Sequence, residues 1–507
     1  MTDTAQQTDH NTAYQELESH VTEMAHISRV LGLLSWDRTV MMPRSGAEAR
    51  AEQYSLLSKI RHERISAPLI GDLIAEADAE RHTLSDWQQA NLREIQRLYK
   101  RATAIPADLQ QKLSHLSLAC ETQWEHSRPE NDFATVRPLL AELVDLTREG
   151  AVAIAEACDM AEPYDALLDE FDKGAAYTDI QPLFAELEDW LPQAVDDAIE
   201  KQEKPLCLGR GFDVNKQKEL SEFILHTMGY KGRFDTSPHP FSSGRLGDVR
   251  ITTRYTSDSF IVDAVLSVMH EAGHGIYDMQ IPEDWGTQPV SGAFDISMAI
   301  HESQAMVMER QIGQSRVFWE FIAPKCRDIF GAEDNEAAWQ ADNLYKTANW
   351  VEKGLIRVEA DEMTYPLHIL LRTKLEKAMI DGDLQVQDLP DAWNDEMQNM
   401  LGITPPDDDN GCMQDPHWYG GCFGYFPSYL LGAMNASQIF QAAKRSLPGL
   451  EEDLKQGQFT SIRDWLKENV HGHGCFYPPR ELIKAATGDY LQLASHKNHL
   501  TKRYLQQ

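Results

Sequence analysis

Apolar residues recur at helical spacing through most of the chain, and this periodicity constrains the fold more than any other feature. Pro43, Pro106 and Pro129 mark joints between the periodic segments, and the connections are short. Strand signals are scarce in this part of the chain. The sequence therefore predicts a mainly helical protein of stacked helices, with helices near residues 13–36, 46–65, 86–103, 106–127 and 133–157.

One stretch, residues 234–259, has β character. It is rich in turn residues and ends in the alternating pattern VRITTRY at 249–255, so we expect a small hairpin or short sheet there. Helices resume from residue 336 and are interrupted by the Gly- and aromatic-rich segment 409–429, DNGCMQDPHWYGGCFGYFPSY. A loop with so many polar and aromatic groups is typical of a segment that lines a functional site.

Composition limits the classes of partner. The chain has 507 residues, of which 80 are acidic and 47 basic, giving a formal net charge of −33. This charge opposes binding to nucleic-acid phosphates and to anionic membranes, so neither is expected as a partner. The N-terminal sequence is polar and acidic, no long apolar run is present, and the seven cysteines show no CxxC spacing. These features predict a globular, cytoplasmic protein with reduced thiols.

The sequence HEAGH at 270–274 lies inside the apolar run 261–278 and indicates a metal site. At about 3.6 residues per turn, His270 and His274 lie one above the other on a helix, with Glu271 beside them. This pattern is typical of zinc hydrolases, although so short a pattern also arises by chance. The alternative interpretation is a pair of hydrogen-bonded histidines in the protein core.

A third ligand is needed, because a catalytic zinc ion usually takes three protein ligands and keeps one position for water. Glu302 is the best choice. It lies 28 positions after His274, in a segment (297–313) whose apolar residues predict a second packed helix. The alternative is an acidic side chain that faces solvent. With Glu302 as ligand, two helices would supply the whole site.

These residue types together permit peptide hydrolysis. A zinc ion can lower the pKa of a bound water to about 7, and Glu271 can accept a proton as the water attacks a carbonyl. Glu271 could then protonate the leaving amine. Tyr, His or Arg side chains near the site would stabilise the oxyanion that forms.

Arg357 lies in an apolar stretch of helical character, 354–372, where an unpaired guanidinium would be costly to bury. It therefore needs an anionic partner. One interpretation pairs it with Glu359 or Asp361 in the same segment. In the other, it binds the terminal carboxylate of a substrate through two hydrogen bonds, which would make the protein an exopeptidase. Arg250 raises the same question.

Six motifs occur in an order and spacing that resemble one known family. They are HPF at 239–241, DVRIT at 248–252, HEAGH at 270–274, HESQ at 301–304, IRVEAD at 356–361 and GCMQDPHW at 411–418. Together they resemble the carboxypeptidase Taq family of thermostable metallocarboxypeptidases, peptidase family M32. The similarity covers nearly the whole chain, since it extends to 33–53, 421–432 and 471–491. Six ordered motifs arise by chance far more rarely than HExxH alone.

The resemblance implies a fold and an activity. The fold is an all-helical, deep-grooved peptidase, with a small β element near the active site, related to angiotensin-converting enzyme and neurolysin. Residues 1–507 would form one large domain, in which a helical part of about 1–200 covers the groove and about 230–507 form the catalytic core. The implied activity is that of a zinc- or cobalt-dependent carboxypeptidase of broad specificity. Its substrates would be peptides with a free C-terminal carboxylate, and members are commonly cytoplasmic homodimers.

The resemblance also implies roles for individual residues. The metal ligands would be His270, His274 and Glu302. Glu271 would act as the general base, and Arg357 would bind the substrate carboxylate. Five further residues fall in motifs that line the family's groove: His239, Arg250 and Gln414 as substrate-binding residues, and His417 and Tyr425 as the residues expected to contact the oxyanion.

One departure concerns the residues around the metal ligands. In some zinc peptidases a carboxylate four residues after the ligating Glu orients a metal-bound His, but Met306 occupies that position here. Asp278 and Asp295 are the replacements that we consider, each more often a surface acid. His471 and His473 lack nearby Cys or acidic partners, so we expect them to be structural or to face solvent.

Two alternative functions remain open. An oligopeptidase could use the same metal site to cut internal bonds without binding a terminal carboxylate. A binding or scaffold protein with a degenerate site is the other alternative, against which the intact His270, Glu271, His274 and Glu302 argue.

Overall fold

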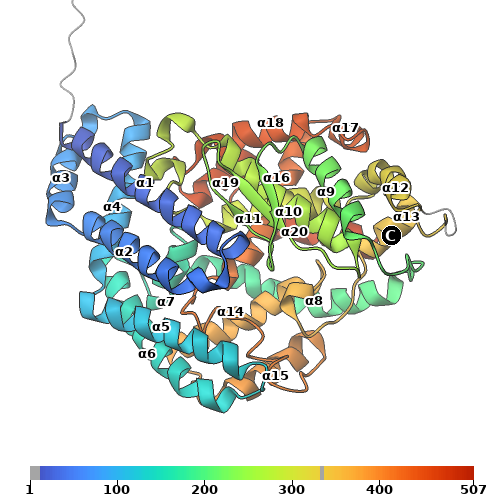
Figure 1. Ribbon diagram of the computed structural model, residues 1–507, viewed down its shortest axis with the longest axis horizontal. Coiled ribbons are helices and arrows are strands. Elements are labelled where there is room, and N and C mark those ends of the chain that lie inside the picture. Colours follow the sequence, from blue (N-terminus) through green and yellow to red (C-terminus); the bar gives the residue numbers. More distant parts are fainter. Residues whose placement is uncertain (1–11, 332–335, 507) are drawn as a thin grey trace, which may run out of the picture.

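The computed structural model describes residues 12–331 and 336–506, and it is built mainly of helices (Figure 1). The first ten α-helices are α1 (Thr12–Val40), α2 (Ala47–Ile65), α3 (Pro68–Ala79), α4 (Asp86–Ala104), α5 (Ala107–Ser127), α6 (Phe133–Ala157), α7 (Pro163–Phe171), α8 (Tyr177–Lys201), α9 (Val214–Met228) and α10 (Ser267–Gln280). The others are α11 (Met298–Met306), α12 (Arg316–Phe330), α13 (Ala341–Ala348), α14 (Tyr365–Asp381), α15 (Leu389–Leu401), α16 (Phe426–Ser446), α17 (Leu450–Lys455), α18 (Thr460–Asn469), α19 (Pro479–Thr487) and α20 (Leu493–Leu500).

Short helices of other types join these elements. The 3₁₀-helices are η1 (Arg44–Gly46), η2 (Arg81–Thr83), η4 (Glu283–Trp285), η5 (Pro289–Ser291), η8 (Arg357–Glu359), η9 (Val386–Asp388) and η10 (His471–His473). The π-helices are η3 (Ile261–Leu266), η6 (Val307–Gly313) and η11 (Thr501–Leu505). The first two flank the elements that carry the candidate site.

Local sequence explains where two of the predicted N-terminal helices, α4 and α6, begin. Ser85 caps α4 in a capping box with Gln88, and Asp132 caps α6 through a hydrogen bond from the backbone of Thr135. The five helices predicted in this region correspond to α1, α2, α4, α5 and α6, so the prediction of a mainly helical fold is confirmed.

The helices pack around two large hydrophobic cores. One core joins α9, the sheet, α10, α12 and α18, and it includes Phe260, Trp319 and Leu466. The other core joins α5–α8 to α14–α16, and it includes Leu140, Leu187 and Trp393. The second core therefore ties part of the N-terminal half of the chain to the C-terminal half. Among the described residues, no helix is long and apolar enough to cross a membrane.

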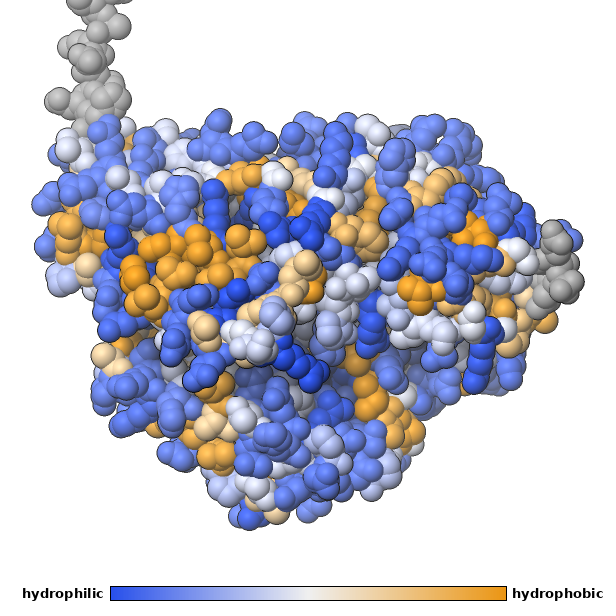
Figure 2. All heavy atoms as spheres, in the orientation of Figure 1, coloured by the Kyte–Doolittle hydropathy of each residue, from blue (hydrophilic) through white to orange (hydrophobic). Residues whose placement is uncertain are grey.

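The N-terminal helices α1 and α2 expose apolar side chains. Figure 2 shows apolar surface gathered over these two helices, on the left of the view. Helix α2 contains no buried residue. The exposed apolar residues of this region include Val30, Leu33, Met41, Tyr54 and Leu56.

The small β element is a three-stranded sheet. Its strands are β1 (Arg233–Thr236), β2 (Ser242–Ser243) and β3 (Arg250–Thr253), in the order β1-β3-β2. Strand β3 pairs in parallel with β1 and antiparallel with β2. The predicted β element is present, but the parallel pairing of β1 and β3 requires the chain to cross over, which a local alternating pattern does not predict.

Candidate active site

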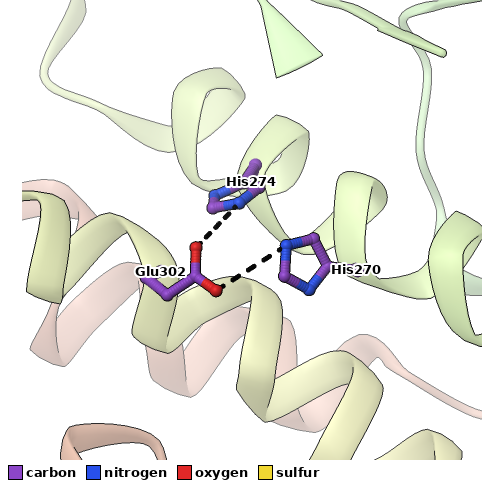
Figure 3. A group of neighbouring side chains, drawn as sticks. All are labelled: His270, His274 and Glu302. Atoms are coloured by element: carbon purple, nitrogen blue, oxygen red, sulfur yellow. Dashed lines mark ion pairs between the residues drawn. The ribbon is translucent and has the colours of Figure 1, made fainter. Parts of the chain in front are cut away.

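His270, His274 and Glu302 come together from two helices. Figure 3 shows the Glu302 carboxylate of α11 pointing at the two imidazole rings of α10. Its Oε2 lies 3.5 Å from Nε2 of His274, and its Oε1 lies 3.9 Å from Nε2 of His270. The three possible ligand atoms all lie within 4.8 Å of one another. The structure thus brings together the three side chains that the sequence predicts as metal ligands.

Two glycines allow this convergence. A Cβ atom on Gly273, within HEAGH, would lie 2.5 Å from the carbonyl oxygen of Gln304 on α11. A Cβ atom on Gly432 of α16 would lie 2.8 Å from Cβ and Cγ of Glu302. Neither contact is sterically allowed, so only glycine permits α10 and α16 to pack this closely against α11.

The three side chains fit a divalent metal ion. Glu302 and His274 are each 7% exposed, so their polar groups are removed from solvent. Burial alone would raise the pKa of Glu302, but His270 and His274 lower it to about 2. Burial alone would lower the pKa of His270, but Glu302 and Glu309 raise it to about 10. A cation would take the place of the proton that Glu302 attracts to His270, and two imidazole nitrogens with one carboxylate form a donor set that suits Zn²⁺.

Glu271 lies beside these ligands and is buried. Burial raises the pKa of its carboxyl group, and the positive charges of His270 and His274 oppose that rise. Within the described part of the chain, its Oε2 atom has no hydrogen-bond partner. A buried carboxylate with a free oxygen and a raised pKa has the properties of a general base.

Glu309 orients His270, and the sequence interpretation missed it. Its Oε2 lies 2.8 Å from Nδ1 of His270, on the side of the ring away from Glu302. Its Oε1 lies 3.2 Å from Nε of Arg310. Glu309 lies in the π-helix η6, seven residues after Glu302. This spacing places it two helical turns beyond the ligand. The carboxylate that orients the metal-bound His is therefore seven residues after Glu302, and not four as in some zinc peptidases.

The two acids considered for this role lie elsewhere, so that interpretation was wrong. Asp278 is 3.4 Å from Nε2 of His301 and 3.4 Å from Nε of Arg245. Asp295 lies 2.9 Å from Nζ of Lys173 and also pairs with Arg97. Neither side chain is hydrogen-bonded to a metal-ligand candidate.

His301 contacts one candidate ligand, and His471 contacts the two helices that carry the ligands. The ring of His301 stacks on that of His274, with centroids 4.2 Å apart. His471 lies 2.7 Å from Oε1 of Gln280 and 2.9 Å from Oε1 of Gln304. Because these glutamines belong to α10 and α11, His471 ties the two helices together, as expected of a structural histidine.

Arg357 is buried, but its partner is neither Glu359 nor Asp361. It lies in the short 3₁₀-helix η8, and α14 begins only at Tyr365, so the stretch of helical character is two separate helices. Its Nη2 lies 2.8 Å from Oδ1 of Asp415, 58 residues away. Glu359 is exposed, and Asp361 accepts hydrogen bonds from the backbone at the start of α14.

Two arginines share the carboxylate of Asp415. Nη2 of the fully buried Arg372 lies 2.7 Å from Oδ2 of Asp415, opposite the contact with Arg357. Burial alone would raise the pKa of Asp415, but Arg372 and Arg357 hold it far below its usual range. Two guanidinium groups and one carboxylate leave this cluster with one net positive charge.

Gln414 and Glu376 hold the segment that supplies Asp415. The side-chain amide of Gln414 makes four hydrogen bonds, to Arg357, Arg372 and the carbonyls of Leu355 and Asn410. Glu376 of α14 accepts hydrogen bonds of 2.7 Å from Tyr164, Trp418 and the backbone of Gly424. Burial raises the pKa of Glu376 to about 7. Sequence reasoning did not identify Glu376, because its partners are distant along the chain.

His417 and Tyr425 stack on each other, with ring centroids 5.4 Å apart. Burial, with the nearby Arg357 and Arg372, lowers the pKa of His417 to about 4 against the opposing effect of Asp415, so the ring is neutral at pH 7. Burial and the charge of Glu302 raise the pKa of Tyr425 to about 12.

Three tyrosines connect the Glu302 region to Arg357. The charges of Glu302 and Arg357 both influence the pKa values of Tyr365, Tyr425 and Tyr429. The hydroxyl of Tyr365 lies 3.3 Å from Nη1 of Arg357. The ring of Tyr429 lies 5.0 Å from that of Tyr425 and 5.3 Å from the Arg357 guanidinium carbon. The metal-ligand candidates and the arginine cluster therefore border one polar region.

His239 and Arg250 lie on the sheet side of the molecule. His239 is exposed in the loop between β1 and β2. Arg250 on β3 pairs with Asp248 at 2.7 Å and lies over the ring of Trp36, 4.5 Å from its centroid. Asp248 is therefore the anionic partner of Arg250 within the protein.

Comparison with known proteins identifies the family. A family model described as carboxypeptidase Taq (M32) metallopeptidase matches residues 16–504. The chain belongs to this family. It is 37% identical to thermostable carboxypeptidase 1 of Thermus thermophilus, over 97% of this chain and 98% of that protein. It is 36% identical to carboxypeptidase 1 of Bacillus subtilis, over 95% of this chain and 96% of that protein.

A solved structure agrees with this assignment. The structure of Trypanosoma cruzi metallocarboxypeptidase 1 superposes with a TM-score of 0.94 at 35% identity, covering 98% of this chain and 100% of that chain. The protein is therefore a metal-dependent carboxypeptidase, a hydrolase that acts on peptides and uses a divalent metal ion. The resemblance and the enzyme class predicted from the motifs are confirmed.

Proposed function

We propose that this M32 carboxypeptidase removes single C-terminal residues of broad chemical type, using a zinc or cobalt ion bound by His270, His274 and Glu302. One observation carries the proposal. The three possible ligand atoms converge within 4.8 Å, with His274 and Glu302 buried and the buried Glu271 beside them. Burying this many ionisable groups together is costly unless a cation balances them.

The bound ion would polarise the scissile carbonyl and lower the pKa of the attacking water. Glu271 accepts the proton of that water through its free Oε2 atom and then donates it to the leaving amine. Glu309 keeps the His270 ring in the orientation that presents Nε2, because it hydrogen-bonds Nδ1.

Arg357 provides the recognition of the C-terminal carboxylate in this proposal. Support comes from the charge of its cluster, in which two guanidinium groups share the single carboxylate of Asp415. A substrate carboxylate supplies the second negative charge and binds a guanidinium in two-point geometry. Gln414 contributes by fixing the backbone of Arg357 and the guanidinium of Arg372.

His417 and Tyr425 contribute at the developing oxyanion. The proposal is supported by a neutral imidazole and a protonated phenol at pH 7, since each can donate a hydrogen bond. His239 and Arg250 stay predictions of substrate contact. The cytoplasmic location, the homodimer and the single domain with a groove covered by residues of about 1–200 also stay predictions from the family resemblance.

The test is hydrolysis of an N-blocked dipeptide and of its C-terminal amide, before and after chelation. We expect release of the free amino acid from the acid only, loss of that activity after chelation, and recovery with Zn²⁺ or Co²⁺. Equal hydrolysis of the acid and the amide would favour an oligopeptidase and contradict the role of Arg357. Full activity in a chelated, metal-free sample would contradict the metal site.

A further inference from the structure

A cavity lined by basic side chains lies among the C-terminal helices. It has a volume of about 440 Å³ and is bordered by the start of α12, the end of α16, α17, and the α20–η11 segment. Among the described residues that line it, five carry a positive charge and only Glu451 carries a negative one; the five are Arg316, Lys444, Arg445, Lys502 and Arg503. This balance is opposite to that of the chain, which has 80 acidic and 47 basic residues.

The neighbouring carboxylates do not neutralise this cluster. Arg316 pairs with Asp342 at 2.6 Å, Lys444 pairs with Glu451, and Arg503 pairs with Glu362 at 2.9 Å. Two cations remain. Arg445 donates to the carbonyl of Thr487 at 3.0 Å, and neither Arg445 nor Lys502 has an ion-pair partner in residues 12–331 and 336–506.

The cavity also offers apolar and hydrogen-bonding surface. Buried Leu454 and Phe440 form part of its wall. Arg316 lies 4.5 Å from the centroid of the Tyr345 ring, which is held in the same wall. Ser495 and Asn498 add neutral polar groups. A volume of this size matches that of small-molecule sites, in which an apolar surface is combined with a few polar groups.

We propose that this cavity binds an organic polyphosphate of nucleotide size. Phosphate groups bind the cationic rim at Arg445 and Lys502, because charge-assisted hydrogen bonds to phosphate are short and strong. The apolar or aromatic part of the ligand packs on the wall at Phe440 and Leu454. The overall negative charge of the protein does not prevent this, since surface charges beyond about 8 Å are largely screened at physiological ionic strength.

The proposed site is separate from the metal-ligand candidates. In η6, Glu309 contacts His270, whereas Gln311 lines the basic cavity. The cavity also reaches Arg503, which donates to the carbonyl of Arg310 at 2.6 Å and to Glu362. The polyphosphate site makes no assumption about peptide hydrolysis, and its failure would leave the proposed catalytic roles intact.

Calorimetric titration of the metal-loaded enzyme with ATP tests the proposal, with sodium tripolyphosphate and adenosine as comparison ligands. We expect ATP to bind, tripolyphosphate to bind more weakly, and adenosine not to bind. The Arg445→Glu/Lys502→Glu variant should bind ATP about tenfold more weakly or worse. The matched control is Lys59→Glu/Lys112→Glu, which makes the same charge change at two exposed lysines of α2 and α5 and should bind ATP as the wild type does.

The milder Arg445→Gln/Lys502→Gln variant removes the two charges without reversing them, so it disturbs folding less than the glutamate variant. Its loss of ATP affinity should be intermediate. ATP binding that is equal in the wild type and both cavity variants would overturn the proposal, because it would place the ligand elsewhere, for example on the metal ion. No ATP binding to the wild type at low salt would overturn it as well. Tripolyphosphate binding as tight as that of ATP would refute the contribution of the apolar wall.

Discussion

The metal-ligand candidates and the arginine cluster differ in how they balance charge. Around His270 and His274, the carboxylates of Glu271, Glu302 and Glu309 gather on two imidazoles, which leaves the region attractive to a cation. Around Asp415, two guanidinium groups share one carboxylate, which leaves the region attractive to an anion. A peptide C-terminus has a carbonyl and a carboxylate one residue apart. In the proposed function, the first region binds the reacting carbonyl end of one substrate and the second binds its terminal carboxylate.

The largest effect on activity is expected beside the metal-ligand candidates. Glu271→Gln should lower kcat by about a thousandfold or more, because the amide cannot accept a proton, while metal content stays at the wild-type level. The measurements are turnover of an N-blocked dipeptide and elemental analysis of the same sample. Near-normal turnover with full metal content would remove Glu271 from the mechanism.

A smaller effect on activity is expected at the arginine cluster. Arg357→Met should reduce kcat/KM for a free-acid dipeptide by about a hundredfold, since it removes a charge-assisted two-point contact. Residual cleavage of the corresponding amide should not fall further. Arg250→Met separates the two arginines, because Arg250 is the other arginine considered for the substrate carboxylate and also pairs with a nearby aspartate; it should keep the preference for the acid. Loss of that preference in Arg250→Met alone would assign carboxylate recognition to the sheet side of the molecule.

A variant of Glu309 tests whether this carboxylate orients the candidate ligand His270. Glu309→Gln should weaken metal affinity about thirtyfold, because the carboxylate that orients the His270 ring and increases its basicity is lost. Competition with a chromophoric chelator measures this affinity directly. Asp278→Asn provides the comparison, since Asp278 reaches the site only through His301, and its effect should be smaller. An equal loss in both variants would show that general destabilisation, not ring orientation, is responsible.

The smallest effect is a pH dependence of stability that comes from Glu376, which holds the segment supplying Asp415. Glu376 has a pKa raised to about 7 in the fold, above its ordinary value of 4.5, so the folded state holds its proton more tightly than the unfolded state. Its stabilising contribution is complete below the unfolded pKa and is lost as pH rises through the folded pKa. Between pH 5 and 7, the free energy of unfolding therefore falls by at most about 1.4 kcal/mol for each unit of pH increase.

Urea unfolding of Glu376→Gln at pH 5, 6 and 7 checks this dependence. The variant should lose the part of the pH slope that Glu376 contributes, whatever its absolute stability. The exposed Glu130→Gln variant should keep the wild-type slope. An unchanged slope in Glu376→Gln would mean that the carboxyl group is ionised throughout this range.

The two regions also differ in how far sequence predicts them. HEAGH fixes His270, Glu271 and His274 on one helix, because helical geometry alone sets their relation, and the helical spacing around Glu302 placed it on a second one. The same geometry could have located Glu309 two turns beyond Glu302. The helical stretch predicted around Arg357 is divided into η8 and α14, and Pro366 in the first turn of α14 is a signal that the second helix starts there.

Partners from distant segments could not be predicted in this way. Asp415 joins Arg357 across 58 residues and Arg372 across 43, and no local periodicity relates such positions. The fit of Gly432 against Glu302 likewise depends on how α16 packs on α11. Helix content and the local metal motif could thus be predicted, whereas the charge balance of the arginine cluster depends on tertiary packing.

The most direct test of the central claim is the metal stoichiometry of the purified wild type and of Glu302→Ala after equilibration in the same Zn²⁺-containing buffer and removal of free metal. If His270, His274 and Glu302 hold one ion, the wild type retains one zinc per chain and the folded variant retains almost none. A folded Glu302→Ala protein that keeps one tightly bound zinc per chain would contradict the account, because the ion would then be held without the side chain that joins the two helices.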